Sequence, residues 1–88
     1  MKAHLQSRIL VVDDERSVTG ALELILHESG HEVVTAHSVV QAMKALSDFH
    51  FDLVITDFRL SDATGIDLIT HIKKENPVTE VILMTAYG

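Results

Sequence analysis

The sequence contains no cysteine and no tryptophan, and it has only one proline among its 88 residues. Without cysteine it has no disulfides, no thiolate metal sites and no thiol nucleophile. Positive charge is also scarce: 7 lysine and arginine residues stand against 13 aspartate and glutamate residues, so the formal net charge is −6. A nucleic-acid-binding surface needs a cationic patch, so we expect no direct nucleic-acid contact by this segment.

Long apolar runs are missing as well. No stretch approaches the roughly 20 apolar residues that a membrane span requires, and the polar segment 1–8 does not have the pattern of a signal peptide. Hydrophobic residues make up 47% of the chain and charged residues 23%, a balance typical of a folded globular domain. These features predict one small acidic domain that is cytoplasmic and does not contact a membrane.

Short aliphatic runs alternate with stretches of helical periodicity along the chain. The runs lack polar alternation, which is typical of strands buried on both faces. The predicted strands are residues 8–12, 32–36, 51–56 and 80–85. The spacing of apolar residues predicts helices over 16–29, from Ser38 onwards, and over 65–76.

All three helices have a predicted apolar stripe, and the second has a predicted cap. The stripe residues are Val18, Ala21, Leu22, Ile25 and Leu26 in the first helix, Val39, Ala42, Met43 and Leu46 in the second, and Ile66, Ile69 and Ile72 in the last. Ser38 followed three residues later by Gln41 fits a capping box, in which each side chain accepts from a free amide at the helix start.

Alternation of strands and helices implies parallel strands joined by right-handed crossovers, with helices on both faces of the sheet. We therefore predict an α/β fold with a doubly wound parallel sheet of the form (βα)3β. Residues 1–88 form a single domain in this prediction. Ligands of such sheets bind at the carboxyl ends of the strands, so the residues directly after each strand are the candidates for chemistry.

Carboxylates follow two of these strands. Asp13 and Asp14 come directly after the first strand, and Asp57 comes after the third. If these strands are neighbours, the three carboxylates converge and raise one another's pKa, unless a divalent cation neutralises them. Oxygen ligands without histidine or sulfur point to Mg²⁺. The alternative is purely structural: Asp13 and Asp14 cap a helix and Asp57 starts a turn.

Asp57 is the single acid on its strand, so it is the candidate nucleophile. A carboxylate can keep one oxygen on a metal and attack a phosphoryl group with the other. Thr85 ends the fourth strand and would offer a hydroxyl to the new phosphoryl oxygen. The alternative for Thr85 is an ordinary β-branched residue at a strand end.

Four separated segments together resemble the receiver domain of two-component response regulators, the CheY-like family. They are residues 9–15 (ILVVDDE), 52–57 (DLVITD), Gly65 and 81–86 (VILMTA). The resemblance implies a flavodoxin-like (CheY-like) sheet with strand order 2-1-3-4. It also implies a phosphoacceptor signalling domain rather than an enzyme with external substrates. Its only chemistry would be self-phosphorylation and autodephosphorylation.

The resemblance also implies a role for each residue of the site. Asp57 would accept a phosphoryl group from a sensor histidine kinase, and Thr85 would be the switch hydroxyl. Mg²⁺ would bind Asp14, Asp57 and the backbone carbonyl of Arg59, with Asp13 assisting through water.

Residues 85–88 (TAYG) are similar to receivers of NtrC-type, sigma-54-dependent regulators, which implies a transcriptional output domain elsewhere in the parent protein. Receivers often have Met-Pro three and four residues after the acceptor. Here those positions are Leu60 and Ser61, which should loosen one turn without removing a reactive group.

The family continues through a further helix, strand and helix, and that strand ends in a lysine that pairs with the phosphoryl group. Lys73 and Lys74 lie in the predicted last helix and cannot replace it. We therefore expect the 88-residue chain to be a C-terminally truncated receiver with weak Mg²⁺ binding and poor phosphorylation. We also expect an open edge on the 80–85 strand, and hence a homo-oligomer.

Three other functions are consistent with parts of the pattern. A Mg²⁺-dependent phosphohydrolase with an aspartyl nucleophile usually has an acid two residues later, where this chain has Arg59. A flavin or nucleotide site needs a phosphate-binding loop, but Asp13 and Asp14 would repel phosphate. The chain could also act only as a folding or oligomerisation unit. The six histidines are expected at helix ends or in solvent, and the remaining acids, Asp62 among them, on solvated faces or as caps.

Overall fold

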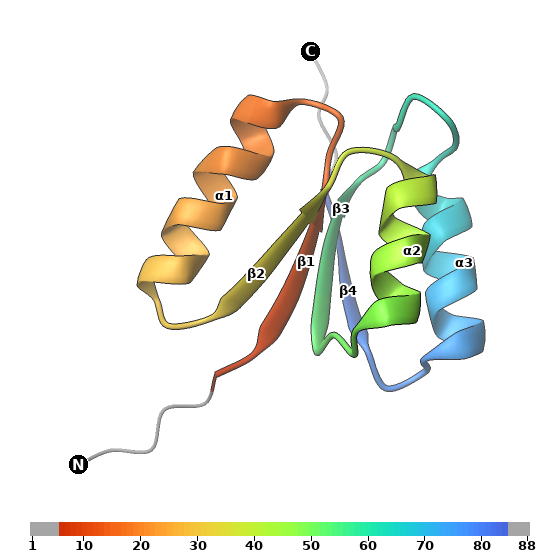
Figure 1. Ribbon diagram of the computed structural model, residues 1–88. Coiled ribbons are helices and arrows are strands. Elements are labelled where there is room, and N and C mark those ends of the chain that lie inside the picture. Colours follow the sequence, from red (N-terminus) through yellow and green to blue (C-terminus); the bar gives the residue numbers. More distant parts are fainter. Residues whose placement is uncertain (1–5, 85–88) are drawn as a thin grey trace.

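A computed structural model of the chain describes residues 6–84. Strands and helices alternate as the sequence predicts (Figure 1). The elements in chain order are β1 (Arg8–Val12), α1 (Arg16–Glu28), β2 (Glu32–Ala36), α2 (Val39–Asp48), β3 (Leu53–Asp57), α3 (Gly65–Glu75) and β4 (Glu80–Met84). None of these three helices is both long and apolar enough to cross a lipid bilayer.

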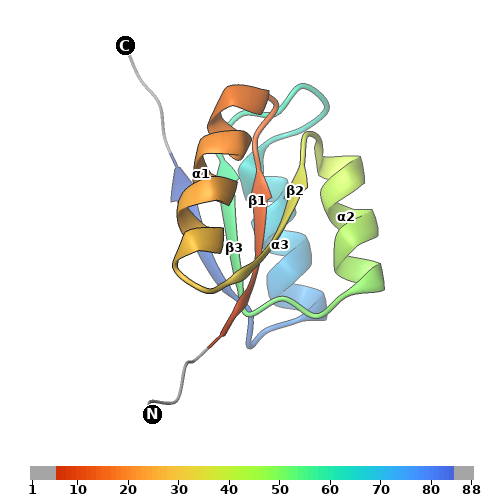
Figure 2. The same ribbon diagram turned by 60° about the vertical axis from the view of Figure 1, so that its left-hand side comes forward.

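The four strands form one parallel sheet in the order β2-β1-β3-β4, which confirms the predicted flavodoxin-like, CheY-like topology. Helix α1 covers one face of the sheet, and α2 and α3 cover the other (Figures 1 and 2). Because both faces are covered, the central strands β1 and β3 are almost entirely apolar until their carboxyl ends.

The sheet separates two hydrophobic clusters. The larger one lies between the sheet and helices α2 and α3, and its fully buried members include Leu10, Val54, Leu68 and Ile72. The smaller one lies under α1 and is built from Ile9, Val11 and Ile55, with Leu22 and Leu26 packed against it. Successive side chains of β1 point to opposite faces of the sheet and enter the two clusters in turn. Strand β1 is therefore packed on both faces.

Three predicted inward residues face solvent instead. Ala21 of α1 is exposed, Ile25 of α1 is 58% exposed and Ile66 of α3 is 47% exposed. Leu68, absent from the predicted stripe, is fully buried. Leu68 and Ile72 are one helical turn apart and both face the sheet. Ile66 precedes Leu68 by two residues, a rotation of about 200° around the helix axis, so it points away from the sheet.

Side chains satisfy the first amides of α2 and α3. The Oγ of Ser38 accepts a hydrogen bond from the Gln41 amide at 3.1 Å, as predicted. The Gln41 side chain, however, accepts from the amide of His37 rather than that of Ser38, so the capping box is displaced by one residue. A complete capping box that was not among the sequence predictions joins Thr64 and Asp67 at the start of α3.

Strand β4 lies at one side of the sheet. It pairs with β3 from Glu80 to Met84, and within residues 6–84 no strand pairs with its other edge. Ile82, in the middle of β4, is 50% exposed. The described part of the chain thus has an open edge at the predicted place.

Candidate metal centre

The pairing of β1 with β3 brings the predicted acidic residues together. Val12 lies beside Thr56 in the parallel register, so the residues that follow them leave the sheet at the same rim. Carboxylate oxygens of Asp13, Asp14 and Asp57 all lie within 4.8 Å of one another. It is the one such cluster of potential metal ligands in residues 6–84.

The three carboxylates differ in exposure. Asp13 is only 5% exposed, Asp57 is partly buried and Asp14 is exposed. Burial raises the pKa of Asp13 above its ordinary value; the hydrogen bond from the Glu15 amide opposes this, and the charges of Asp57, Asp14 and Glu15 add to it. No ion pair within the described chain joins a lysine or arginine to the cluster. The negative charge is therefore not balanced by neighbouring side chains.

The side chain of Asp57 uses one of its two oxygens locally. The amide of Phe58 donates to Oδ1 at 2.9 Å, and no other hydrogen bond of this side chain is formed within residues 6–84. This contact fixes the orientation of the carboxylate at the end of β3. Its Oδ2 atom is left to act as a ligand or a nucleophile.

The loop after β3 forms a short antiparallel turn. The Leu60 amide donates to the Ala63 carbonyl at 3.0 Å, and the Gly65 amide donates to the Phe58 carbonyl at 2.7 Å. These bonds flank a bridge between Arg59 and Thr64. The Arg59 carbonyl accepts no hydrogen bond from any described residue, so it is available as a further oxygen ligand.

Gly65 allows the start of α3 to approach the end of β3 closely. A Cβ at this position would collide with the backbone carbonyl oxygen of Asp57 and would lie 3.0 Å from a methyl group of Leu83. Backbone atoms cannot move aside as a flexible side chain does. The position therefore requires glycine because of close approach.

The structure thus brings together Asp13, Asp14 and Asp57, with Arg59 in the adjoining loop. Thr85, the predicted switch hydroxyl, lies outside the described residues. Two histidines make contacts that the sequence did not indicate: His37 lies 3.2 Å from the hydroxyl of Thr19, and His31 accepts from the amide of Ser7. These contacts depend on the packing of distant elements and have no local sequence signal.

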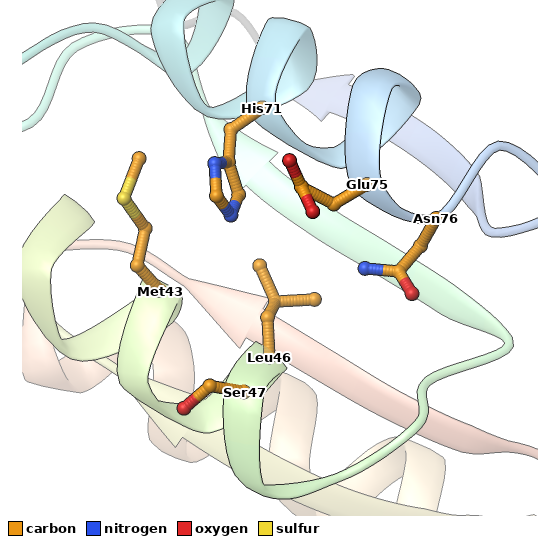
Figure 3. A pocket seen from close by; sticks show the side chains of 6 residues that line it. All are labelled: Met43, Leu46, Ser47, His71, Glu75 and Asn76. Atoms are coloured by element: carbon orange, nitrogen blue, oxygen red, sulfur yellow. The ribbon is translucent and has the colours of Figure 1, made fainter.

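A separate cavity of about 360 Å³ lies between α2 and α3. Figure 3 shows the six side chains that line it: Met43, Leu46 and Ser47 from α2, His71 and Glu75 from α3, and Asn76 directly after α3. None of the three clustered carboxylates contributes to this cavity. The acidic rim and the cavity are therefore distinct features.

Comparison with known proteins agrees with this geometry. The family model of the response regulator receiver domain matches residues 9–88. The response regulator protein PilR of Pseudomonas aeruginosa is 37% identical over 83 residues, which are 94% of this chain and 19% of PilR. The transcriptional regulatory protein ZraR of Escherichia coli K12 is 40% identical over 80 residues, 91% of this chain and 18% of ZraR. The chain spans less than a fifth of either protein.

Solved structures share the fold. The response regulator TrrA of Thermotoga maritima, in complex with Mg²⁺-BeF, superposes with a TM-score of 0.87 at 36% identity. The match covers 93% of this chain and 71% of that one.

Replacing Gly65 by alanine should destabilise the domain by about 1–3 kcal/mol, because the new methyl group must displace the Asp57 backbone. Gly20→Ala is the matched control, since no atom lies within 4 Å of a Cβ there and alanine favours its helix. Urea unfolding followed by circular dichroism compares the two variants. Equal stability of Gly65→Ala and the wild type would contradict the close approach.

Asp13→Asn should stabilise the metal-free domain at neutral pH by on the order of 1 kcal/mol, because it removes a buried like charge. Since the pKa of Asp13 is higher in the folded chain than its ordinary 3.8, the folded state binds more protons. Wild-type stability should therefore gain from Asp13 as the pH falls through the folded pKa toward 3.8, and the variant should lack this gain.

Thermal unfolding at several pH values, with Asp48→Asn as the exposed control, checks this expectation. A less stable Asp13→Asn variant in metal-free buffer would overturn it.

Proposed function

The chain belongs to the response regulator receiver family, and we propose that it is a phosphoacceptor module in which Asp57 takes a phosphoryl group with the help of Mg²⁺. The observation that carries the proposal is the cluster of Asp13, Asp14 and Asp57 at the rim shared by β1 and β3. It combines a partly buried carboxylate that has an available oxygen with two further acids that have no cationic partner in the described chain.

The donor set suits Mg²⁺. Its side-chain ligands are all carboxylate oxygens, and the Arg59 carbonyl adds a neutral oxygen nearby in sequence. Burial is the main cause that raises the pKa of Asp13, and the charges of Asp57, Asp14 and Glu15 add to it, so a cation at this site would offset an unfavourable charge. Asp13, Asp14, Asp57 and the Arg59 carbonyl would hold the ion, with Asp13 acting through water. Bound Mg²⁺ supplies positive charge that offsets the charge of an incoming phosphoryl group.

Asp57 performs the chemical step in this proposal. Its Oδ2 attacks the phosphorus of a phosphohistidine on a partner kinase while the Phe58 amide holds Oδ1. An O–P bond forms, the P–N bond breaks, and its electron pair remains on the kinase imidazole. Thr85, which follows β4 in the sequence, is proposed as the hydroxyl that binds the new phosphoryl group.

The proposed partners follow from this role. They are a sensor histidine kinase as the phosphoryl donor and an output domain in the parent protein. PilR and ZraR are described as regulatory proteins, which supports a transcriptional output. A cytoplasmic location is part of the proposal, because a receiver that controls transcription acts in the compartment that holds DNA.

The wild-type chain should take up a single phosphoryl group from acetyl phosphate, slowly and only with Mg²⁺ present. The slow rate is expected because no lysine is paired with the cluster within the described chain. Asp57→Asn should take up none, and the exposed control Asp48→Asn should behave like the wild type. Intact-mass spectrometry measures the product. Labelling of Asp57→Asn, or no labelling of the wild type at any Mg²⁺ concentration, would refute the proposal and leave the chain as a folding or assembly unit.

We also propose that the 88-residue chain self-associates through the outer edge of β4. This edge has no strand partner within the described residues, and Ile82 presents an apolar side chain beside it. Unpaired backbone groups next to an apolar surface favour pairing with a second copy of the same strand.

Light scattering at high protein concentration should give a mass above that of the monomer. Ile82→Lys should shift the chain to monomer, because a lysine opposes edge pairing. Val78→Lys is the control, since Val78 is 77% exposed and precedes the strand. A monomeric wild type, or equal effects of the two variants, would exclude the proposed edge.

A further inference from the structure

Asp62 joins two elements that are distant in the sequence. It lies in the loop between β3 and α3, and its carboxylate reaches the first turn of α2. The amide of Val39 donates to Oδ1 at 2.9 Å, and the amide of Val40 donates to Oδ2 at 3.1 Å. In Figure 1 this loop lies beside the end of α2 where that helix begins.

The contact is not a redundant cap of α2. Ser38 already accepts from the Gln41 amide, which lies one residue beyond the pair that Asp62 serves. The local side chains of α2 leave the first two amides without an acceptor, and Asp62 satisfies both. A carboxylate is the favoured side chain at this place because the helix start is electropositive. Two bonds from two oxygens fix the orientation of the carboxylate as well as its position.

The same contact restrains the loop that carries Arg59. The base of the loop is closed by the bond between Gly65 and Phe58, and Leu60 is 8% exposed within the main hydrophobic cluster. Asp62 is the anchor nearest the tip. Arg59 lies between the base and these two anchors, and its carbonyl accepts no hydrogen bond from the described residues. The Leu60 amide shares a peptide plane with this carbonyl and donates to the carbonyl of Ala63, the residue after Asp62. The orientation of the Arg59 carbonyl therefore depends on how residues 61–63 are held.

We propose that Asp62 is a positioning residue for the metal site, which holds the Arg59 carbonyl in place by tying the loop to the start of α2. The inference rests on the proposed function, because Asp62 can position a metal ligand only if the Arg59 carbonyl and the three carboxylates bind Mg²⁺. Asp62 itself does not contact the ion in this assignment. Removing a direct hydrogen-bond partner of a metal ligand commonly changes metal affinity by about 10–100-fold, and Asp62, which acts through the loop, should lie at the lower end of this range.

The experiment compares Asp62→Ala with Ser38→Ala in the isotopically labelled 88-residue chain. Both variants remove a side-chain acceptor from the start of α2, but only the first releases the loop. Mg²⁺ is titrated and the amide signals of Asp57 and Arg59 are followed by NMR. We expect Asp62→Ala to weaken Mg²⁺ binding by about 10-fold and to increase the fast backbone motion of residues 59–63 without metal. Ser38→Ala should change neither quantity.

Asp62→Asn provides a second variant in case the alanine variant does not fold. Its amide keeps one acceptor oxygen and loses the other, so its Mg²⁺ affinity should lie between those of the wild type and Asp62→Ala. Unchanged Mg²⁺ affinity in both Asp62 variants would overturn the positioning role while leaving the proposed function intact. Equal losses in Asp62→Ala and Ser38→Ala would also overturn it, because helix stability alone would then explain the effect. A wild type that does not bind Mg²⁺ would overturn both.

Discussion

The parallel pairing of β1 with β3 determines where the acidic groups of this domain lie. Val12 and Thr56 are neighbours in that register, and both are fully buried. The residues that follow these two therefore emerge from the core together, at the same rim of the sheet. Asp13 and Asp57 follow them immediately. The apolar strands beneath thus hold like charges close together, an arrangement that the carboxylates would not adopt by themselves. Hydrophobic burial supplies the free energy that opposes this repulsion.

The loop that carries Arg59, the proposed backbone ligand, depends on a different set of contacts. Gly65 allows α3 to begin against the carbonyl of Asp57, and the loop before it is closed by main-chain hydrogen bonds. Receivers often have a proline in this loop, where the present chain has Ser61. The bonds from Asp62 to α2 restrain the same segment from outside the loop. The sheet therefore places the three carboxylates, and the loop holds the Arg59 backbone two residues after Asp57.

The strands and the acidic residues at their ends could be predicted from local patterns, whereas the strand order was predicted from the resemblance to receiver domains. Apolar runs ending in aspartate reveal the strands and their carboxyl ends, and the topology of α/β folds brings those ends together. Helix faces were predicted less well: Ile66 is exposed and Leu68 is buried, because each of several stripes fits the apolar residues of a short helix. The contact of Asp62 with α2 could not be predicted, since it depends on how a loop packs against a helix more than 20 residues away.

Asp13 and Asp62 show how the same side chain serves two purposes in one small domain. Burial raises the pKa of Asp13, whereas two backbone amides at the start of α2 lower the pKa of the exposed Asp62. The charge of Asp62 is satisfied within the protein, so it strengthens the fold. The charge of Asp13 is opposed by its surroundings, so it weakens the metal-free fold and favours any cation that binds there. The loss of stability in the metal-free fold and the gain in cation affinity are thermodynamically linked. The repulsion around Asp13 that a bound cation relieves adds to the affinity of the site for that cation.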